Sequence, residues 1–177
     1  LVGYLQDAGV EYALVGGYAI AAHGFNRFSE DIDILVNPSV ENSRRWILAL
    51  SRLPDGATRE LTASPDVFAQ NQLYAIRIND EFTVDVMPSI AGQSWESMQP
   101  HIVTMAIDGT PVRILDLPGL LKTKQGLRPK DQMDAVLADP ARGPLVHAIG
   151  VHGWLYRADG ELFAIRGGLN KAPREQR

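Results

Sequence analysis

Two aspartates, Asp31 and Asp33, stand two positions apart at the start of the apolar run 32–36. In an extended strand alternate side chains share one face, about 6.5–7 Å apart at the backbone, so these carboxylates point the same way. Carboxylates this close repel each other unless a cation lies between them. Two divalent metal ions about 4 Å apart can meet that need and hold both ends of a phosphoryl displacement. A solvent-facing acidic pair at the start of a strand explains a bare D-x-D equally well.

Asp85 is a third candidate, in the segment EFTVDVMPSI. It alternates with Val84 and Val86, so on a half-buried strand it faces away from both. A carboxylate on a central strand is costly unless it is paired or bound to a metal. Taken alone, Asp85 fits a solvent-facing residue; taken with D-x-D on a neighbouring strand, it favours a metal site. Oxygen ligands with no nearby Cys or His suit magnesium or manganese rather than zinc.

The pair Gly16-Gly17 lies between a predicted strand at 12–15 and a predicted helix at 18–23. Glycines in such a turn let the backbone approach a ligand and direct free N–H groups at an anion. Many strand-to-helix turns carry glycine, so the glycine pair alone is weak evidence for an anion-binding site. Its place one helix upstream of D-x-D lets both converge on one triphosphate.

The remaining pattern predicts the elements that position these residues. Further helices are expected over 1–9, after the N-cap Ser39, and over 117–124 and 130–138. Residues 32–36 form a strand, and two hairpins pair 73–78 with 82–87 and 102–107 with 112–115. This order predicts an α+β fold over residues 1–140, a small mixed sheet with helices packed on one face. Residues 141–177 are expected to form a short C-terminal extension, a hairpin followed by a disordered tail.

Composition limits the classes of protein. The chain has 177 residues, no cysteine and a formal net charge of −4. The absence of cysteine excludes disulfides, thiolate metal sites and a cysteine nucleophile, and fits a cytoplasmic protein. The acidic balance disfavours binding to extended duplex DNA, which usually needs a basic face. No stretch approaches the roughly 20 apolar residues of a membrane helix, so no membrane partner is expected.

The segment GGYAIAAHGFNRFSEDIDILV resembles the GG…D-x-D fingerprint of the DNA polymerase β-like nucleotidyltransferase superfamily, with thirteen residues between Gly17 and Asp31. It is similar to the small bacterial branch that includes AbiEii-type toxins and minimal nucleotidyltransferases. Arg27-Phe28-Ser29 matches that branch's Arg-x-Thr/Ser element. The segment LPGLLKTKQGLRPKDQMDAVL resembles its later helix pair. The resemblance covers roughly residues 1–138 and implies the nucleotidyltransferase fold.

The resemblance also implies roles for individual residues. Asp31 and Asp33 would ligate two Mg²⁺ ions, for which Mn²⁺ can substitute, and Asp85 would bind the catalytic ion and help deprotonate the acceptor. The implied contacts to the nucleotide are Gly16, Gly17, Arg27, Ser29, Lys122 and Lys130. The implied reaction is in-line attack by a hydroxyl on the α-phosphorus of a nucleoside triphosphate, with release of pyrophosphate.

Several functions remain open at this stage. Within the superfamily, the chain fits a toxin with a cognate antitoxin or an antibiotic-modifying enzyme, and the acceptor hydroxyl belongs to tRNA, a protein or a small molecule. From another class, a catalytically silent nucleotide- or protein-binding module keeps the same fold. A third class is a metal-dependent phosphohydrolase built on the same aspartates, but the sequence lacks a His-Asp metal cluster. The tail segment PLVHAIGVHGWLYRADGELFAI resembles the end of β-class carbonic anhydrases, whose zinc site needs cysteines that this chain lacks.

Overall fold

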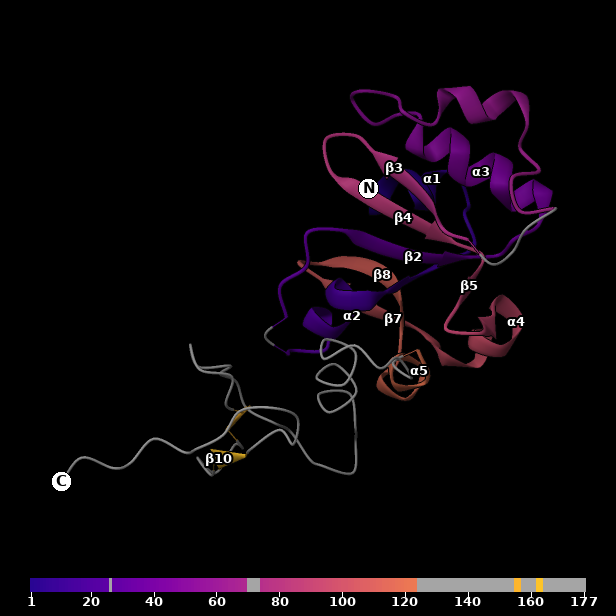
Figure 1. The fold of residues 1–177 in the computed structure, drawn as a ribbon. Coiled ribbons are helices and arrows are strands. Elements are labelled where there is room, and N and C mark those ends of the chain that lie inside the picture. The colour runs from indigo at the N-terminus through magenta and orange to yellow at the C-terminus, as the bar shows by residue number, and fades with distance from the viewer. Residues whose placement is uncertain (26, 70–73, 124–154, 157–161, 164–177) are drawn as a thin grey trace, which may run out of the picture.

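The computed structural model describes residues 1–25, 27–69, 74–123, 155–156 and 162–163. Figure 1 shows their arrangement. The helices are α1 (Val2–Asp7), α2 (Gly16–Ala22), α3 (Val40–Leu50), α4 (Trp95–Met98) and α5 (Leu117–Lys122), with short 3-10 helices η1 (Arg59–Ala63) and η2 (Gln99–His101). The strands are β1 (Tyr12–Val15), β2 (Ile32–Val36), β3 (Ile76–Asn79), β4 (Thr83–Met87), β5 (Ser89–Ile90), β6 (Gln93–Ser94), β7 (Ile102–Ile107), β8 (Thr110–Leu115), β9 (Leu155–Tyr156) and β10 (Leu162–Phe163).

Six strands form one mixed sheet in the order β3-β4-β2-β1-β8-β7 (Figure 1). Strand β1 pairs antiparallel with β2 and parallel with β8, and β2 pairs parallel with β4. The hairpins β3–β4 and β7–β8 form the two edges of this sheet. The predicted class, α+β with a small mixed sheet and helices, is therefore confirmed.

The core lies around β1, whose four side chains are all buried. An alternating strand buries all its side chains only when both of its faces are covered. Helix α3 contributes Trp46, Ile47 and Leu50 to the core, and the Trp46 ring lies 6.1 Å from that of Phe68. Burying each such side chain contributes about 1.5–3 kcal/mol. Helix α2 packs against β1 and β2 and contacts α5.

Capping explains where two helices begin. The Ser39 hydroxyl accepts a hydrogen bond from the Asn42 amide at 3.3 Å, which confirms the predicted start of α3. Asp116 caps α5 in the same way by accepting from the Gly119 amide at 2.7 Å. Such caps satisfy backbone donors that the first helical turn leaves without partners.

The predicted elements differ from the observed ones in several places; for example, β8 begins at Thr110 rather than at 112, and η1 and η2 were not predicted. Helix α2 begins at Gly16, because a backbone φ of +65° at that glycine turns the chain directly from β1 into the helix. The short pair β5–β6 and helix α4 were not predicted. Strand β3 begins at Ile76 rather than at 73, a position outside the described residues.

The predicted helix at 130–138 also lies outside the described residues, as does most of the predicted extension 141–177. Within that extension, β9 and β10 form an antiparallel pair in which Leu162 lies opposite Tyr156. Among the described helices, none has the length and apolar character to cross a membrane.

Candidate active site

Asp31, Asp33 and Asp85 lie on one face of the sheet. Strands β2 and β4 run parallel, and Asp33 is the direct register partner of Asp85. Residues paired in this way project to the same side, and Asp31 shares the face of Asp33 because it lies two positions earlier. The carboxylates that the D-x-D pattern and the 82–87 alternation singled out are thus brought together by one strand pairing.

Arg77 supplies the cation of this cluster. It lies on β3 directly opposite Asp85. Its Nε donates to Asp85 Oδ1 at 2.9 Å, and one terminal nitrogen donates to Asp85 Oδ2 at 2.8 Å and to Asp31 Oδ2 at 3.0 Å. Two parallel bonds from one guanidinium to one carboxylate form the stronger kind of charged pair.

Arg77 and the carboxylates of Asp85 and Asp31 form one charged cluster. Hydrogen bonding to Asp85 is the largest cause that raises the pKa of Arg77, followed by the charges of Asp85 and Asp31. Only 15% of the Asp85 side chain is exposed, against 38% for Asp31 and 56% for Arg77. Two carboxylates therefore share one guanidinium, and Asp33 lies on the same face of the sheet.

Gly16 brings the backbone against Asp33. A β-carbon at this position would lie 2.0 Å from Asp33 Oδ2, and the φ of +65° is in the region that side-chain-bearing residues rarely adopt. Only glycine combines this turn with so close an approach. The predicted glycine turn and the predicted aspartate are consequently in direct contact.

Ser29 and Arg27 pack against the second glycine. A β-carbon on Gly17 would lie 2.6 Å from Ser29 Cβ and 3.7 Å from Arg27 Cγ. The Ser29 hydroxyl donates to the Asp31 carbonyl at 3.0 Å, and Arg27 donates to the Phe28 carbonyl at 2.6 Å. The segment leading into Asp31 is therefore held on the glycine turn.

The two lysines predicted from the resemblance have different standing. Lys122 ends α5, and its amine lies 2.8 Å from His101 Nε2, while His101 Nδ1 lies 3.0 Å from Asp116 Oδ1. This chain of contacts fits a His101 ring that carries its proton on Nδ1 and accepts from Lys122. Lys130 lies outside the described residues.

Carboxylate oxygens are the donors that a hard divalent cation prefers. Within the described ranges, however, no three His, Cys, Asp or Glu side chains are gathered as a metal-holding group. The Arg77 guanidinium lies between Asp31 and Asp85 and takes three of their oxygens as hydrogen-bond acceptors.

Sequence reasoning did not find Arg77. The sequence signal that could have found Arg77 is its positive charge, because opposite charges on directly facing residues of paired strands stabilise the pair. The hairpin turn was expected at Asn79–Glu81, which pairs Asp85 with Ala75. The observed register pairs Asn79 with Thr83 and so sets Arg77 opposite Asp85.

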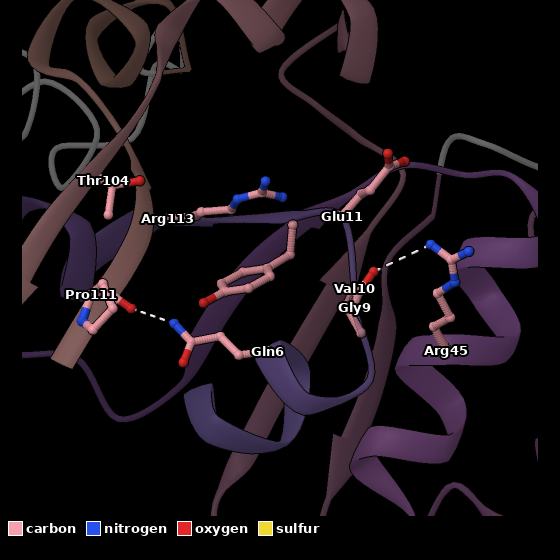
Figure 2. Close-up of a pocket in the computed structure, with 9 residues that line it drawn as sticks. Gln6, Gly9, Val10, Glu11, Arg45, Thr104, Pro111 and Arg113 are labelled. Carbon is pink, nitrogen blue, oxygen red and sulfur yellow. Dashed lines mark hydrogen bonds between the residues drawn. The ribbon is translucent and has the colours of Figure 1, made fainter.

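A pocket of about 480 Å³ lies elsewhere, at the first residues of β1 (Figure 2). Tyr12 lines it and pairs with Val36, whereas Asp33 pairs with Val15 at the other end of β1. Burial raises the pKa of the Tyr12 phenol, against the opposing effect of Arg113. Arg45 and Gln6 in its wall donate to the carbonyls of Gly9 and Pro111, so the wall is partly tied to itself.

The following similarities to known proteins were found. A family model described as a domain of unknown function, DUF6298, matches residues 125–177. No curated protein sequence matches the chain. Among solved structures, the chain is similar to the antibiotic-resistance factor ANT(2'')-Ia, with 17% identity over 80% of this chain and 82% of that one and a TM-score of 0.45.

It is also similar to an antigenic nucleotidyltransferase-like protein from Paracoccidioides brasiliensis, with 18% identity over 79% of this chain and 72% of that one and a TM-score of 0.44.

Proposed function

We propose that this chain is a metal-dependent nucleotidyltransferase that moves a nucleoside monophosphate from a nucleoside triphosphate to a hydroxyl acceptor. The observation that carries the proposal is the register of Asp33 with Asp85 on parallel strands, with Asp31 on the same face and Gly16 against Asp33. A like-charged cluster beside a glycine turn is suited to a cation and a phosphate chain together.

Each residue then has a defined task. Asp31, Asp33 and Asp85 would hold Mg²⁺, which when bound neutralises phosphate charge and polarises the reacting oxygens. The backbone amides of Gly16 and Gly17 bind phosphate oxygens, and Ser29 fixes the segment that presents Asp31. Asp85 accepts the proton of the attacking hydroxyl. Positioning and charge neutralisation supply most of the rate enhancement in such transfers.

The test has a binding step and a transfer step. Calorimetry with the four nucleoside triphosphates, with and without Mg²⁺, should show binding that requires the metal and disappears in Asp33→Ala. The matched control is Asp66→Ala, because Asp66 is an exposed aspartate in the loop that follows η1.

The transfer step uses triphosphates labelled at the α-phosphorus. Incubated with the protein and cell extract, they should transfer label to an acceptor. Labelled tRNA or protein favours a toxin, and a labelled antibiotic added to the extract favours an antibiotic-modifying enzyme. Absence of binding to every triphosphate would favour a silent module.

A further inference from the structure

Arg77 uses the oxygens that the proposed metal site needs. Both oxygens of Asp85 and Oδ2 of Asp31 accept hydrogen bonds from its guanidinium at 2.8–3.0 Å. Mg²⁺ binds oxygens at about 2.0–2.1 Å and demands near-octahedral geometry. A guanidinium hydrogen-bonded to the same oxygens would lie next to a divalent ion, where two positive charges repel strongly. The two cations are therefore alternatives at this place.

Arg77 is also free to move away without disturbing the core. Among the strands that the structure describes, β3 is at the edge of the sheet and pairs with β4 alone. Its neighbour Ile78 is buried and anchors the strand, whereas more than half of the Arg77 side chain is exposed. A change of side-chain rotamer is enough to carry the guanidinium into solvent.

We propose that Arg77 is a resident counter-cation that holds Asp31 and Asp85 together in the metal-free protein and is displaced when the divalent metal binds. This inference depends on the proposed function, since it concerns the same site. It makes Arg77 a positioning residue: it keeps the like-charged aspartates in place before the metal arrives and weakens metal binding by competing for Asp31 and Asp85.

The direct test is the affinity of the full chain for Mn²⁺, measured by electron paramagnetic resonance of the free ion. Arg77→Gln removes the competing charge, so we expect the variant to bind Mn²⁺ about three- to tenfold more tightly than the unaltered protein. Arg77→Lys keeps the charge but loses the paired bonds, and we expect an intermediate affinity. The matched control is Arg52→Gln. It breaks an exposed ion pair in which Arg52 lies 3.0 Å from Asp7, outside the carboxylate cluster, so the affinity for Mn²⁺ should stay unchanged.

A second readout needs no activity. In chelator, Arg77→Gln leaves Asp31 and Asp85 without the guanidinium that they share, so its melting temperature should fall below that of Arg52→Gln. Saturating Mn²⁺ should raise the melting temperature of Arg77→Gln by more than that of the unaltered protein, because metal replaces the lost charge only in that variant.

The outcomes separate the inference from the function. Equal or weaker Mn²⁺ binding by both Arg77 variants, with normal binding by the unaltered protein, overturns the exchange and leaves the proposed function standing. Failure of the unaltered protein to bind Mn²⁺, with or without a triphosphate, overturns both. Should Arg77→Gln not fold, Arg77→Lys alone decides, because tighter binding by that variant is expected only from competition.

Discussion

The paired strands β1 and β2 end in two contrasting ways. At the end where Val15 meets Asp33, Asp33 lies beside Asp85, whose carboxylate shares the Arg77 guanidinium with Asp31. At the end where Tyr12 meets Val36, the side-chain amide of buried Asn42 accepts from the Glu11 amide at 2.7 Å and donates to the carbonyls of Glu11 and Asn37. The first end gathers acidic side chains on one face of the sheet. At the second end, which we call the complete end, the polar side-chain groups of Asn42 all have hydrogen-bond partners.

The pocket of about 480 Å³ described above lies at the complete end. The pocket in Figure 2 carries Arg45 and Arg113 together with Glu11, so its charges are mixed. The carboxylate face instead carries three aspartates with Arg77 beside them. The comparison teaches that the acidic cluster and the pocket lie at opposite ends of the same strand pair.

The largest effect should follow from Asp33→Asn, which removes one charge from the carboxylate end. We expect nucleotide transfer to fall about 10³-fold or more, because a lost metal ligand removes several kcal/mol of transition-state stabilisation. Steady-state transfer of α-labelled triphosphate measures it. Glu11→Gln, at the complete end, is the control and should retain activity within about twofold. Equal losses in both variants would erase the distinction between the two ends.

Asn42→Ala should show the opposite behaviour. It leaves the partly buried amide of Glu11 without its partner, so we expect a loss of about 1–3 kcal/mol in the free energy of unfolding. Urea denaturation measures that loss. Metal-dependent triphosphate affinity per folded molecule should stay unchanged, and a drop in that affinity would show that the two ends are coupled.

Gly16→Ala tests the contact between the glycine turn and Asp33. The new methyl would collide with Asp33 Oδ2 and also strain the backbone, at a cost of about 1–2 kcal/mol for the φ alone. Displacement of Asp33 should lower transfer about ten- to a hundredfold. Gly9→Ala is closely matched, since Gly9 has a φ of +63° with no atom within 4 Å. It should lose stability but keep activity; a similar loss of activity there would refute the steric explanation.

A smaller effect, confined to acid pH, is expected at Asp80 on the β3–β4 turn. Desolvation acts to raise the pKa of Asp80, but the backbone amides of Asp55, Glu81, Ala57 and Gly56 together lower it below its usual 3.8. A lowered folded pKa means that this stabilisation is present above about pH 4 and is lost as pH falls through the folded value. Asp80→Asn should therefore flatten the pH dependence of the melting temperature below pH 4. An unchanged slope would show that these bonds do not contribute.

The smallest effect is expected from Arg113→Ala at the pocket. Arg113 is exposed and lies at the end away from Asp33, so triphosphate affinity should change by less than about twofold at physiological salt. Calorimetry measures it. A tenfold loss would mean that the pocket, not the carboxylate face, receives the phosphates.

Alternating and capped segments were the parts of the fold that the sequence could predict. Strands β1, β2, β7 and β8 follow apolar runs, and Ser39 signals the start of α3. The β5–β6 pair could not be predicted in this way, because it turns through Ala91 with a φ of 49°, a conformation that alanine rarely signals. The placement of the three aspartates on one face followed from period-two alternation, whereas Arg77 depended on a hairpin register that the turn residues did not specify.

The pairing of Asp33 with Asp85 also has a consequence for the order of folding. About fifty residues of chain separate the two, and parallel strands cannot meet until that long loop has closed, which makes such contacts slow to form. Local helices and hairpins can appear earlier, but the acidic face cannot. During synthesis the three aspartates therefore come together only after the β3–β4 hairpin has emerged and docked on β2.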